Sequence, residues 1–398
     1  MAAVTESHSG RKRNVVLLLG SFNSGGAERQ LIQLARLLKG SPRYAVRLAV
    51  LDKSGVLRGE AERLETGEIP AYPLGSFASG RMVAQTLRFR RFLKRERIDV
   101  LHTEGFYTNV FGLIGATLAG VPARVAFRGE IEGLRTPAQQ RVERLVFRLA
   151  HTIHANSLAV RSRLLEEGVP DRKIAVVYNG LDLKRVQPDA AMSRSQMLAA
   201  CGLEPLERRQ LVTLVANLRY PVKDHPMFVR MAARVRKARP NTAFIVAGEG
   251  VLLESTRQLA REAGLGDSVL FIGSCERLSA LLAVSDVCVL TSKSEGFSNA
   301  ILEYMAAGRP VVATAVGGAG EAIQDGVTGY LVAAGDDNAM AGHVVKLLSD
   351  EHVRQAFGEA GRRRIQDRFS DRAQLLNTER MYDVTLARLP WTAAERSV

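Results

Sequence analysis

The chain alternates short apolar segments with longer amphipathic ones, and this alternation limits the folds open to it more than any other feature. The first apolar segment, residues 14–20, is a Val and Leu run that predicts a buried strand. The segment that follows, residues 26–39, places four leucines on one face of a helix. Strands that alternate with helices form a parallel sheet covered on both faces, so an α/β fold is expected.

Two such series are present along the 398 residues, a length that suits two domains. In the first series, further strands are expected at 44–51, 98–102, 124–127, 152–155 and 174–177, with helices at 81–97, 106–119 and 140–149. In the second, strands are expected at 211–216, 242–247, 269–272, 287–290 and 311–314, with helices at 225–237 and 299–307 and a helical pattern over 336–389.

The stretch between the two series sets the expected domain boundaries. Residues 184–209 hold two prolines and many charges and show no strand pattern, so we expect a linker between a first domain, 1–183, and a second, 210–370. Residues 371–398 are expected to form a helix that can pack back on the first domain, and 1–13 a disordered lead-in. Doubly wound domains bind ligands outside the carboxyl ends of their strands, which places the site in a cleft between the two domains.

The basic residues are unevenly distributed. The chain has 55 Lys and Arg against 41 Asp and Glu, a formal charge of +14, and residues 1–183 alone hold 28 against 17. A positive field on one domain favours an anionic partner, such as a membrane surface, a phosphorylated acceptor or nucleic acid. The alternative is that the proteome from which the chain comes is rich in arginine throughout, so that the charge indicates no partner. Nucleic acid is the weakest of the three partners, because the sequence has no recognition helix or zinc-site pattern.

The composition also indicates the compartment. No apolar run of about 18 residues is present, so the sequence predicts no membrane span. The first residues lack the apolar core of a secretory signal. The three cysteines, Cys201, Cys275 and Cys288, have neither disulfide nor metal-site spacing. We therefore expect a protein of the reducing cytoplasm.

The strongest chemical signal is residues 291–308, Thr-Ser-Lys-Ser-Glu-Gly-Phe-Ser-Asn-Ala-Ile-Leu-Glu-Tyr-Met-Ala-Ala-Gly, which lie between an expected strand and an expected helix. Gly296 permits close approach of the backbone to a ligand. The free amides at the helix start would form an anion site that suits a diphosphate, and they belong to Phe297, Ser298 and Asn299. Glu295 and Glu303 can face the same cleft and accept hydrogen bonds from sugar hydroxyls. The alternative is a capped helix with two solvated glutamates.

A second signal follows the first strand of the second series, in Ala216-Asn-Leu-Arg-Tyr-Pro-Val-Lys-Asp-His225. Arg219 and Lys223 can converge on one pyrophosphate from this loop. A departing diphosphate gains negative charge in the transition state, and fixed cations stabilise that charge without a metal. No convincing Asp-x-Asp motif lies in the expected cleft segments, so no metal ion is expected. The alternative is a pair of exposed loop cations.

Two further segments lie at strand ends of the first series. Ser24-Gly-Gly-Ala-Glu-Arg-Gln30 follows the first strand, but it lacks the Gly-x-Gly-x-x-Gly pattern of a dinucleotide site. Leu101-His-Thr-Glu-Gly-Phe-Tyr-Thr-Asn109 places His102 and Glu104 at the end of another strand. For the first segment the alternative is a simple strand-to-helix turn, and for the second it is a structural histidine.

Together these motifs resemble the retaining family-four glycosyltransferases, which have the GT-B fold. Residues 291–308 are similar to their Glu-x7-Glu motif, and the similarity continues through Gly308-Arg-Pro-Val-Val-Ala-Thr-Ala-Val-Gly-Gly-Ala-Gly-Glu321 and Asp325-Gly-Val-Thr-Gly-Tyr-Leu-Val332. The resemblance covers most of the chain. It implies two Rossmann-like domains that face each other across a cleft, and transfer of a sugar with retention from a nucleoside-diphosphate donor.

The resemblance also implies roles for individual residues of the second domain. Glu303 would bind the ribose hydroxyls of the donor, and Glu295 would contact the transferred sugar. Arg219 and Lys223 match an Arg and a Lys that the family keeps for the diphosphate. Residues 273–278 would border the base, although they carry no readable code for its identity.

In the first domain the resemblance assigns loops to the donor and the acceptor. Gly25 and Gly26 would face the donor across the cleft and allow its phosphate or the acceptor to approach closely. His102 belongs to a stretch that lines the acceptor side in many members, and Glu104 lies beside it. The chain departs from the family at Arg128, which stands where many members carry a site histidine. Arginine cannot act as a base, but it can hold an anionic leaving group or acceptor.

The expected helix at 81–97 is basic and amphipathic. Arg88, Arg91 and Arg95 fall opposite its apolar face. Such a helix can lie against anionic lipid, so one expectation is peripheral contact with the inner face of a membrane, near a lipid-linked acceptor. The alternative is a helix packed on the sheet with a solvated outer face.

Two functions of different classes follow. The first is a metal-independent retaining glycosyltransferase with a nucleotide-sugar donor and a sugar or lipid-linked acceptor, as in polysaccharide biosynthesis. The second is a non-catalytic or regulatory protein that binds sugar nucleotides on the same scaffold, for which Arg128 is the argument. The intact pairs Glu295 with Glu303 and Arg219 with Lys223 favour the enzyme.

Overall fold

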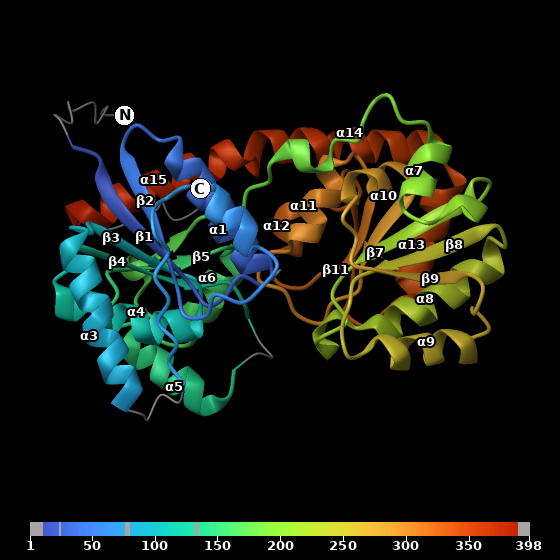
Figure 1. The fold of residues 1–398 in the computed structure, drawn as a ribbon. Coiled ribbons are helices and arrows are strands. Elements are labelled where there is room, and N and C mark those ends of the chain that lie inside the picture. The colour runs from blue at the N-terminus through green and yellow to red at the C-terminus, as the bar shows by residue number, and fades with distance from the viewer. Residues whose placement is uncertain (1–10, 24, 76–79, 132–134, 389–398) are drawn as a thin grey trace.

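The structure, a computed structural model, describes residues 11–23, 25–75, 80–131 and 135–388. Two six-stranded parallel sheets lie side by side, each with helices on both faces (Figure 1). The expected fold class of two doubly wound α/β domains is therefore confirmed. Most of the expected disordered lead-in and the end of the expected C-terminal helix, at 389–398, fall outside the described residues.

The first sheet has the strand order β2-β1-β3-β4-β5-β6. Its strand β1 is buried from Val15 to Leu19, because helices cover both faces and leave no solvent-facing row. The strands are β1 (Arg13–Leu19), β2 (Tyr44–Val50), β3 (Val100–Thr103), β4 (Ala123–Arg128), β5 (Thr152–Ala155) and β6 (Ile174–Val176). The helices are α1 (Gly26–Lys39), α2 (Arg58–Arg63), α3 (Gly80–Arg95), α4 (Phe106–Ala119), α5 (Pro137–Val146) and α6 (Leu158–Glu166).

The second sheet has the strand order β12-β11-β10-β7-β8-β9. Its strands are β7 (Gln210–Val215), β8 (Thr242–Ala247), β9 (Val269–Gly273), β10 (Val287–Leu290), β11 (Val311–Thr314) and β12 (Gly329–Val332). Its helices are α8 (His225–Ala238), α9 (Leu253–Glu262), α10 (Leu278–Val284), α11 (Asn299–Ala306), α12 (Ala319–Ala322), α13 (Asp337–Ser349) and α14 (Glu351–Arg368).

The segment expected to be a linker, 184–209, contains helix α7 (Arg194–Ala200) and buries apolar side chains. Leu198 and Leu206 belong to the same buried cluster as Leu211 and Ile245 of the second sheet. The short 3-10 helix η2 (Leu183–Val186) precedes α7 and lies at the junction of the two domains. This stretch therefore connects the domains and also completes the core of the second one.

The C-terminal helix α15 (Asp371–Ala387) leaves the second domain and packs on α1 and β4 of the first (Figure 1). Its Tyr382 is fully buried and meets the Tyr44 ring edge-on at a centroid distance of 5.5 Å. Where the chain returns, the Leu181 backbone N–H donates to the Phe369 carbonyl at 2.9 Å. The chain therefore passes between the domains twice, and the contacts of α15 hold them together.

Candidate active site

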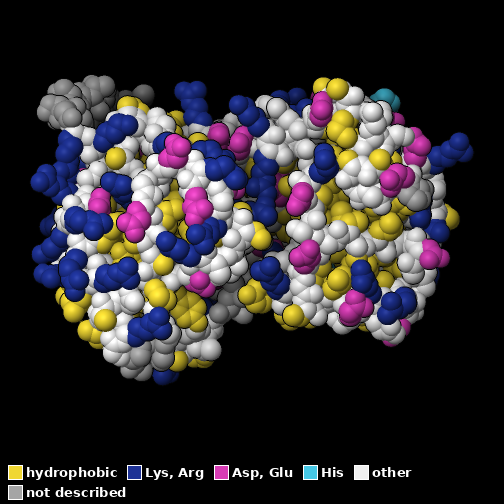
Figure 2. Space-filling model, in the orientation of Figure 1, with side chains coloured by type: hydrophobic (Ala, Val, Ile, Leu, Met, Phe, Trp, Pro, Cys, Tyr) yellow, Lys and Arg dark blue, Asp and Glu magenta, His cyan; other side chains and the backbone are white. Residues whose placement is uncertain are grey.

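Each sheet reverses its strand order at one point, and the loops on either side of that point diverge. In the second sheet the point lies between β7 and β10, which are followed by the loops 216–224 and 291–298. In the first sheet it lies between β1 and β3, which are followed by residues 20–25 and 104–105. Ligands of doubly wound sheets bind at such points. Figure 2 shows a furrow between the two domains with basic side chains along its upper part.

Lys223 and Glu295 are brought together at the reversal point of the second sheet. The Lys223 Nζ lies 2.6 Å from the Glu295 Oε1, and the Ser292 hydroxyl donates to the same oxygen at 2.6 Å. The Thr291 hydroxyl donates to the Lys223 carbonyl at 2.8 Å and ties the two loops together. With its carboxylate partner, Lys223 forms a fixed cation beside a fixed anion, which is the arrangement expected for a site that separates charge during reaction.

Arg219 lies in the same loop but does not join this ion pair. Its side chain is exposed, and its backbone N–H donates to the Asn217 Oδ1 at 3.2 Å. A Cβ at Gly250 would collide with the backbone of Leu218, so this loop packs against a position that only glycine can fill. The positive charge of Arg219 acts to lower the pKa of Glu28 in the first domain, so the two side chains are near enough to interact.

The turn before α11 presses against the first domain. A Cβ at Gly296 would collide with the carbonyl of Gly129, so glycine is required for this close approach. The Phe297 ring is buried and lies 5.0 Å from the Tyr178 ring and 5.3 Å from the Phe369 ring, between centroids. The side chain of Phe297 therefore joins the two domains, and only its backbone is left for the predicted diphosphate contact.

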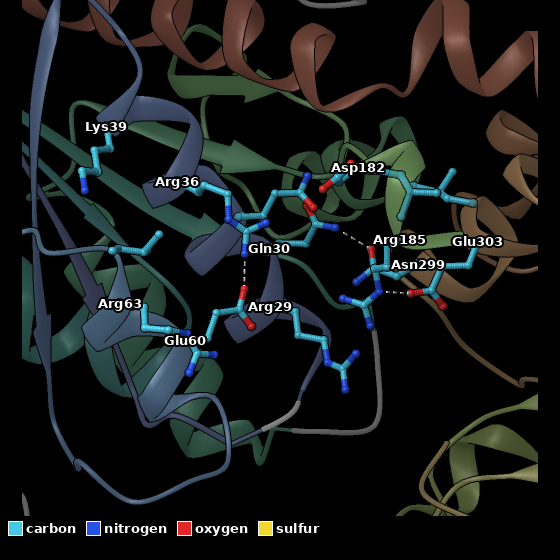
Figure 3. A pocket seen from close by; sticks show the side chains of 14 residues that line it. Arg29, Gln30, Arg36, Lys39, Glu60, Arg63, Asp182, Arg185, Asn299 and Glu303 are labelled. Carbon is cyan, nitrogen blue, oxygen red and sulfur yellow. Dashed lines mark hydrogen bonds and ion pairs between the residues drawn. The ribbon is translucent and has the colours of Figure 1, made fainter. Parts of the chain in front are cut away.

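Asn299, the first residue of α11, crosses the cleft with its side chain. Its Oδ1 accepts from the Gln30 Nε2 at 3.1 Å and from the Asn179 Nδ2 at 2.8 Å, and its Nδ2 donates to the Gly26 carbonyl at 3.3 Å (Figure 3 shows the bond to Gln30). The predicted donor residues Gly26 and Asn299 are thus in direct contact. Ser298 is buried at the helix start and makes no side-chain capping bond.

Glu303 lies one turn into α11 and is buried beside two arginines. Its Oε1 lies 3.4 Å from the Arg185 Nε (Figure 3). Burial raises the pKa of the Glu303 carboxyl, while the charges of Arg185 and Arg29 act in the opposite direction. Neither arginine was predicted, because Arg185 falls in the expected linker and Arg29 lies on a helix whose leucine face was the dominant signal.

In the first domain, Glu28 and Glu104 form a carboxyl pair at the end of the sheet. The Glu104 Oε2 accepts the Gly20 backbone N–H at 2.5 Å, and the two side chains hydrogen-bond to each other. Burial raises the pKa of both carboxyls, and the charge of Glu28 raises that of Glu104 further. The Glu28 carboxylate also packs against Gly25, where a Cβ would collide with it. Ser24, the first residue of this motif, lies outside the described residues.

Two residues expected on the acceptor side do not reach the cleft. His102 is fully buried, with Nδ1 2.8 Å from the Tyr382 hydroxyl and Nε2 3.1 Å from the Nδ1 of His154. Arg128 is also buried and pairs with Glu143 at 2.6 Å and Glu167 at 3.3 Å. Both side chains are therefore satisfied inside the first domain, and their predicted acceptor contacts stay predictions.

A carboxylate that joins the domains was not predicted. The Glu321 Oε1 and Oε2 accept the backbone N–H groups of Ala159 and Leu158 at 2.9 and 2.7 Å, and the Tyr178 hydroxyl donates to Oε2 at 2.8 Å. A residue of the second domain thus satisfies the free amides at the start of α6 in the first domain. The signal was present, since Glu321 ends the glycine-rich run quoted above.

Neither a metal cluster nor a membrane span is found in the described part of the chain. No group of three His, Cys, Asp or Glu side chains there could hold a metal ion. No helix among the described residues is long and apolar enough to cross a bilayer.

Two family patterns match the chain, one in each domain. The pattern described as Glycosyltransferase Family 4 matches residues 24–185, and the pattern described as Glycosyl transferases group 1 matches residues 209–350. The D-inositol 3-phosphate glycosyltransferase of Salinispora arenicola is 30% identical over 331 residues, which cover 77% of this chain and 72% of that protein. The N-acetyl-alpha-D-glucosaminyl L-malate synthase of Bacillus anthracis is 32% identical over 213 residues, and this chain spans only about half of its length, 54%.

Solved structures share the fold over nearly the whole chain. HepE of Anabaena in complex with UDP superposes with a TM-score of 0.81 at 21% identity, over 93% of this chain and 99% of that one. The sucrose-phosphate synthase from Thermosynechococcus elongatus superposes with a TM-score of 0.77 at 20% identity, over 94% and 100%. At these identities the likeness establishes the two-domain architecture.

Proposed function

The chain belongs to the family-four glycosyltransferases of the GT-B fold, and we propose that it transfers a sugar with retention from a nucleoside-diphosphate donor to an acceptor. The observation that carries this proposal is the Lys223–Glu295 ion pair at the reversal point of the second sheet, next to the start of α11. A cation, a carboxylate and a helix terminus in one place suit a donor that has a diphosphate joined to a sugar.

In the proposed reaction, the acceptor hydroxyl attacks the anomeric carbon on the face from which the diphosphate departs. The bond between that carbon and the phosphate oxygen breaks, and the departing phosphate takes the proton of the hydroxyl. Lys223, with Arg219 nearby in the loop, stabilises the charge that develops on the diphosphate, so the proposal needs no metal. Glu295 orients the sugar and Glu303 binds the ribose.

The surroundings of Arg128 favour the enzyme over the non-catalytic alternative. That alternative rested on Arg128, whose charge is matched by Glu143 and Glu167 inside the first domain. These ion pairs give Arg128 a role in the fold, which weakens it as an argument against catalysis.

The experiment that tests the enzyme begins with a thermal-shift screen of UDP, GDP, ADP and their sugars. The stabilising sugar nucleotide is then assayed for hydrolysis and transfer, with and without a chelator. Retention is checked by NMR of the anomeric proton in the first-formed product. Binding without turnover, for every acceptor tested and for water, would favour the regulatory alternative.

For the acceptor, we propose a sugar or lipid-linked molecule that an anionic membrane surface presents to the first domain. One relative is named UDP-Gal:alpha-D-GlcNAc-diphosphoundecaprenol alpha-1,3-galactosyltransferase, a name that specifies a lipid-linked acceptor. Basic side chains gather over the outer edge of the first domain, on the side of α3 (Figure 2). On α3 itself, Arg88, Arg91 and Arg95 are exposed.

The surroundings of these arginines favour a weak and reversible contact. Val83 and Leu87 are exposed on the same helix, by 63% and 43%, and supply apolar surface between the charges. Arg95 is partly neutralised, because its Nε lies 3.0 Å from a Glu96 carboxylate oxygen. Each basic residue near an anionic surface contributes about 1 kcal/mol, and salt screens it.

Co-sedimentation with vesicles tests the membrane contact. We expect the protein to bind anionic but not neutral vesicles at low salt, and the triple change of Arg88, Arg91 and Arg95 to Glu to abolish binding. Arg363→Glu on α14, which is exposed on the second domain, serves as the matched control and should bind as the wild type does. Equal binding to neutral and anionic vesicles would rule the contact out.

A further inference from the structure

A basic cavity of about 680 Å³ lies beside Glu303, between α1, α2, η2 and α11. The side chains of Arg36, Arg63 and Glu60 lie on one side of it and those of Arg185 and Glu303 on the other, with Arg29 between them (Figure 3). We call this cavity the α1–α2 pocket. Its lining includes Asn299 and Glu303, which are predicted donor contacts, but not Lys223, Glu295 or Arg219, so it adjoins the proposed diphosphate site without sharing its cations.

The charges of the α1–α2 pocket do not balance. Its lining contains five basic residues and three acidic ones. Two of the acids are already paired, Glu60 with Arg36 and Glu303 with Arg185. The third, Asp182, accepts the Lys184 backbone N–H at 3.0 Å as the cap of η2. Within the described residues this leaves two guanidinium groups without an ion pair, those of Arg29 and Arg63.

Arg29 is the more informative of the two. Its Nε is shielded from solvent, and among the described residues it has no hydrogen-bond acceptor. Buried donors in folded proteins are nearly always satisfied, so an orphan on the wall of a cavity indicates a missing acceptor. Burial lowers the pKa of the Arg29 guanidinium, and the nearby charge of Arg185 lowers it further. A bound anion would supply both the acceptor and the opposite charge.

We propose that the α1–α2 pocket is a second anion site and binds a phosphate group, with Arg29 and Arg63 as its principal ligands. Guanidinium groups present forked donors that match phosphate oxygens, and the cavity is large enough for a phosphate ester. The phosphate can come from a phosphorylated substrate or from free inorganic phosphate. The geometry of the site is the same for both sources.

The test uses Lys223→Ala as the background, which weakens anion binding at the donor site, so that the changes at Arg29 and Arg63 report on the pocket. Inorganic pyrophosphate is titrated by calorimetry into Lys223→Ala and into the same chain carrying Arg29→Gln and Arg63→Gln. We expect saturable binding to the background variant and a loss of affinity of about 10-fold or more in the triple variant. Arg58→Gln, on the same α2 helix but outside the pocket, is the matched control and should change nothing.

Two results would overturn the site. One is an unchanged affinity in the triple variant, and the other is absence of saturable binding once Lys223 is replaced. If the glutamine variant fails to fold, the variant with Arg29→Lys and Arg63→Lys replaces it in the test. The expected loss of affinity is smaller, because lysine keeps the charge but lacks the paired N–H donors of a guanidinium. Because the assay measures binding alone, its result is independent of whether the chain has transferase activity.

The source of the phosphate is resolved by three further probes in the same background. These are inorganic phosphate, glycerol 3-phosphate as a soluble ester, and vesicles that contain phosphatidic acid. Tighter binding of an ester than of inorganic phosphate, sensitive to Arg29→Gln, supports a substrate phosphate. The reverse order supports free phosphate. Insensitivity of all three probes to Arg29→Gln contradicts the site.

Discussion

The two domains have similar doubly wound sheets, yet they treat the charges at their carboxyl ends differently. In the second domain, Lys223 and Glu295 pair at the mouth of the cleft, where the lysine side chain is 20% exposed and the carboxylate 11%. In the first domain, Arg128 is buried with Glu143 at 3% and 1%. One pair is accessible to a ligand and the other is enclosed by the fold.

The difference shows that a charged residue at a strand end is not by itself a sign of ligand binding. A fully enclosed charge must be matched within the protein, and a substrate does not reach it. In the first domain Glu143 also pairs with Arg135, so several ion pairs connect the end of β4 to α5. We therefore expect substitutions there to affect stability, and substitutions at Lys223 and Glu295 to affect chemistry.

The largest expected effect comes from Arg128→Gln. Removing one partner of a buried ion pair leaves the others uncompensated, and such changes cost about 3–5 kcal/mol. We expect a fall of that size in the free energy of unfolding of the first domain, measured by urea titration with circular dichroism. Arg91→Gln, an exposed arginine of the same domain, is the control and should change stability by less than about 0.5 kcal/mol. Equal stability of both variants would return Arg128 to the list of candidate ligands.

The next largest expected effect is on turnover, and it tests the accessible Lys223–Glu295 pair of the second domain. Lys223→Ala removes a cation that we place on the departing diphosphate, which should reduce turnover about 100-fold, or roughly 3 kcal/mol, with little change in stability. Lys293→Ala provides the control, because Lys293 lies in the neighbouring loop with 60% of its side chain exposed. Near-normal turnover of purified Lys223→Ala would remove this loop from the active site.

A smaller effect separates the two glutamates of the second domain. Glu303→Gln should weaken binding of the free nucleoside diphosphate by about 2 kcal/mol, because a ribose hydroxyl loses a charged acceptor. Glu295→Gln should leave that affinity unchanged and abolish transfer, since its proposed partner is the sugar. Calorimetry with the nucleotide that the screen identifies measures both. If the two variants lose nucleotide affinity equally, the assigned roles are wrong.

Sequence reasoning located the strands well, for a physical reason, and two residues that it predicted for the second-domain site, Lys223 and Glu295, are in contact. Strands such as β5 and β8 are buried on both faces, and their bounds match the expected residues because the apolar runs end where burial ends. Lys223 and Glu295 lie in loops that directly follow two such strands at the reversal point. In this domain the apolar runs mark the strands, and the polar motifs directly after them mark the loops at the reversal point.

The contacts of the predicted first-domain residues could not be read from their position in the sequence. His102 was placed at a strand end, but its orientation depends on Tyr382, which lies 280 residues further along the chain. Arg29 and Arg185 flank Glu303 only because the two domains meet there. Contacts made across domains or by a returning helix leave no local pattern, so a single sequence does not reveal them.

The smallest expected effect concerns the pH dependence of stability at Glu104. Its pKa is raised by burial and by the charges of Glu28 and Glu130, whereas the Gly20 amide acts in the opposite direction. The folded chain therefore keeps a proton that the unfolded chain loses above its ordinary pKa near 4.5. Because the folded state binds more protons, stability falls as the pH rises from that value through the folded pKa.

Glu104→Gln replaces the protonated carboxyl with a neutral amide that still accepts from the Gly20 N–H. The part of the fall in stability with rising pH that is due to Glu104 should therefore disappear. We expect the free energy of unfolding of the variant to decline less than that of the wild type between about pH 5 and pH 8, measured by urea titration. Glu254→Gln, an exposed glutamate on α9 with 74% of its side chain accessible, should keep the wild-type slope. If Glu104→Gln also keeps the wild-type slope, the carboxyl is ionised in the folded protein. The first domain would then hold an ionised carboxylate at the end of its sheet, and the contrast between the two domains would be weaker than the Arg128 network suggests.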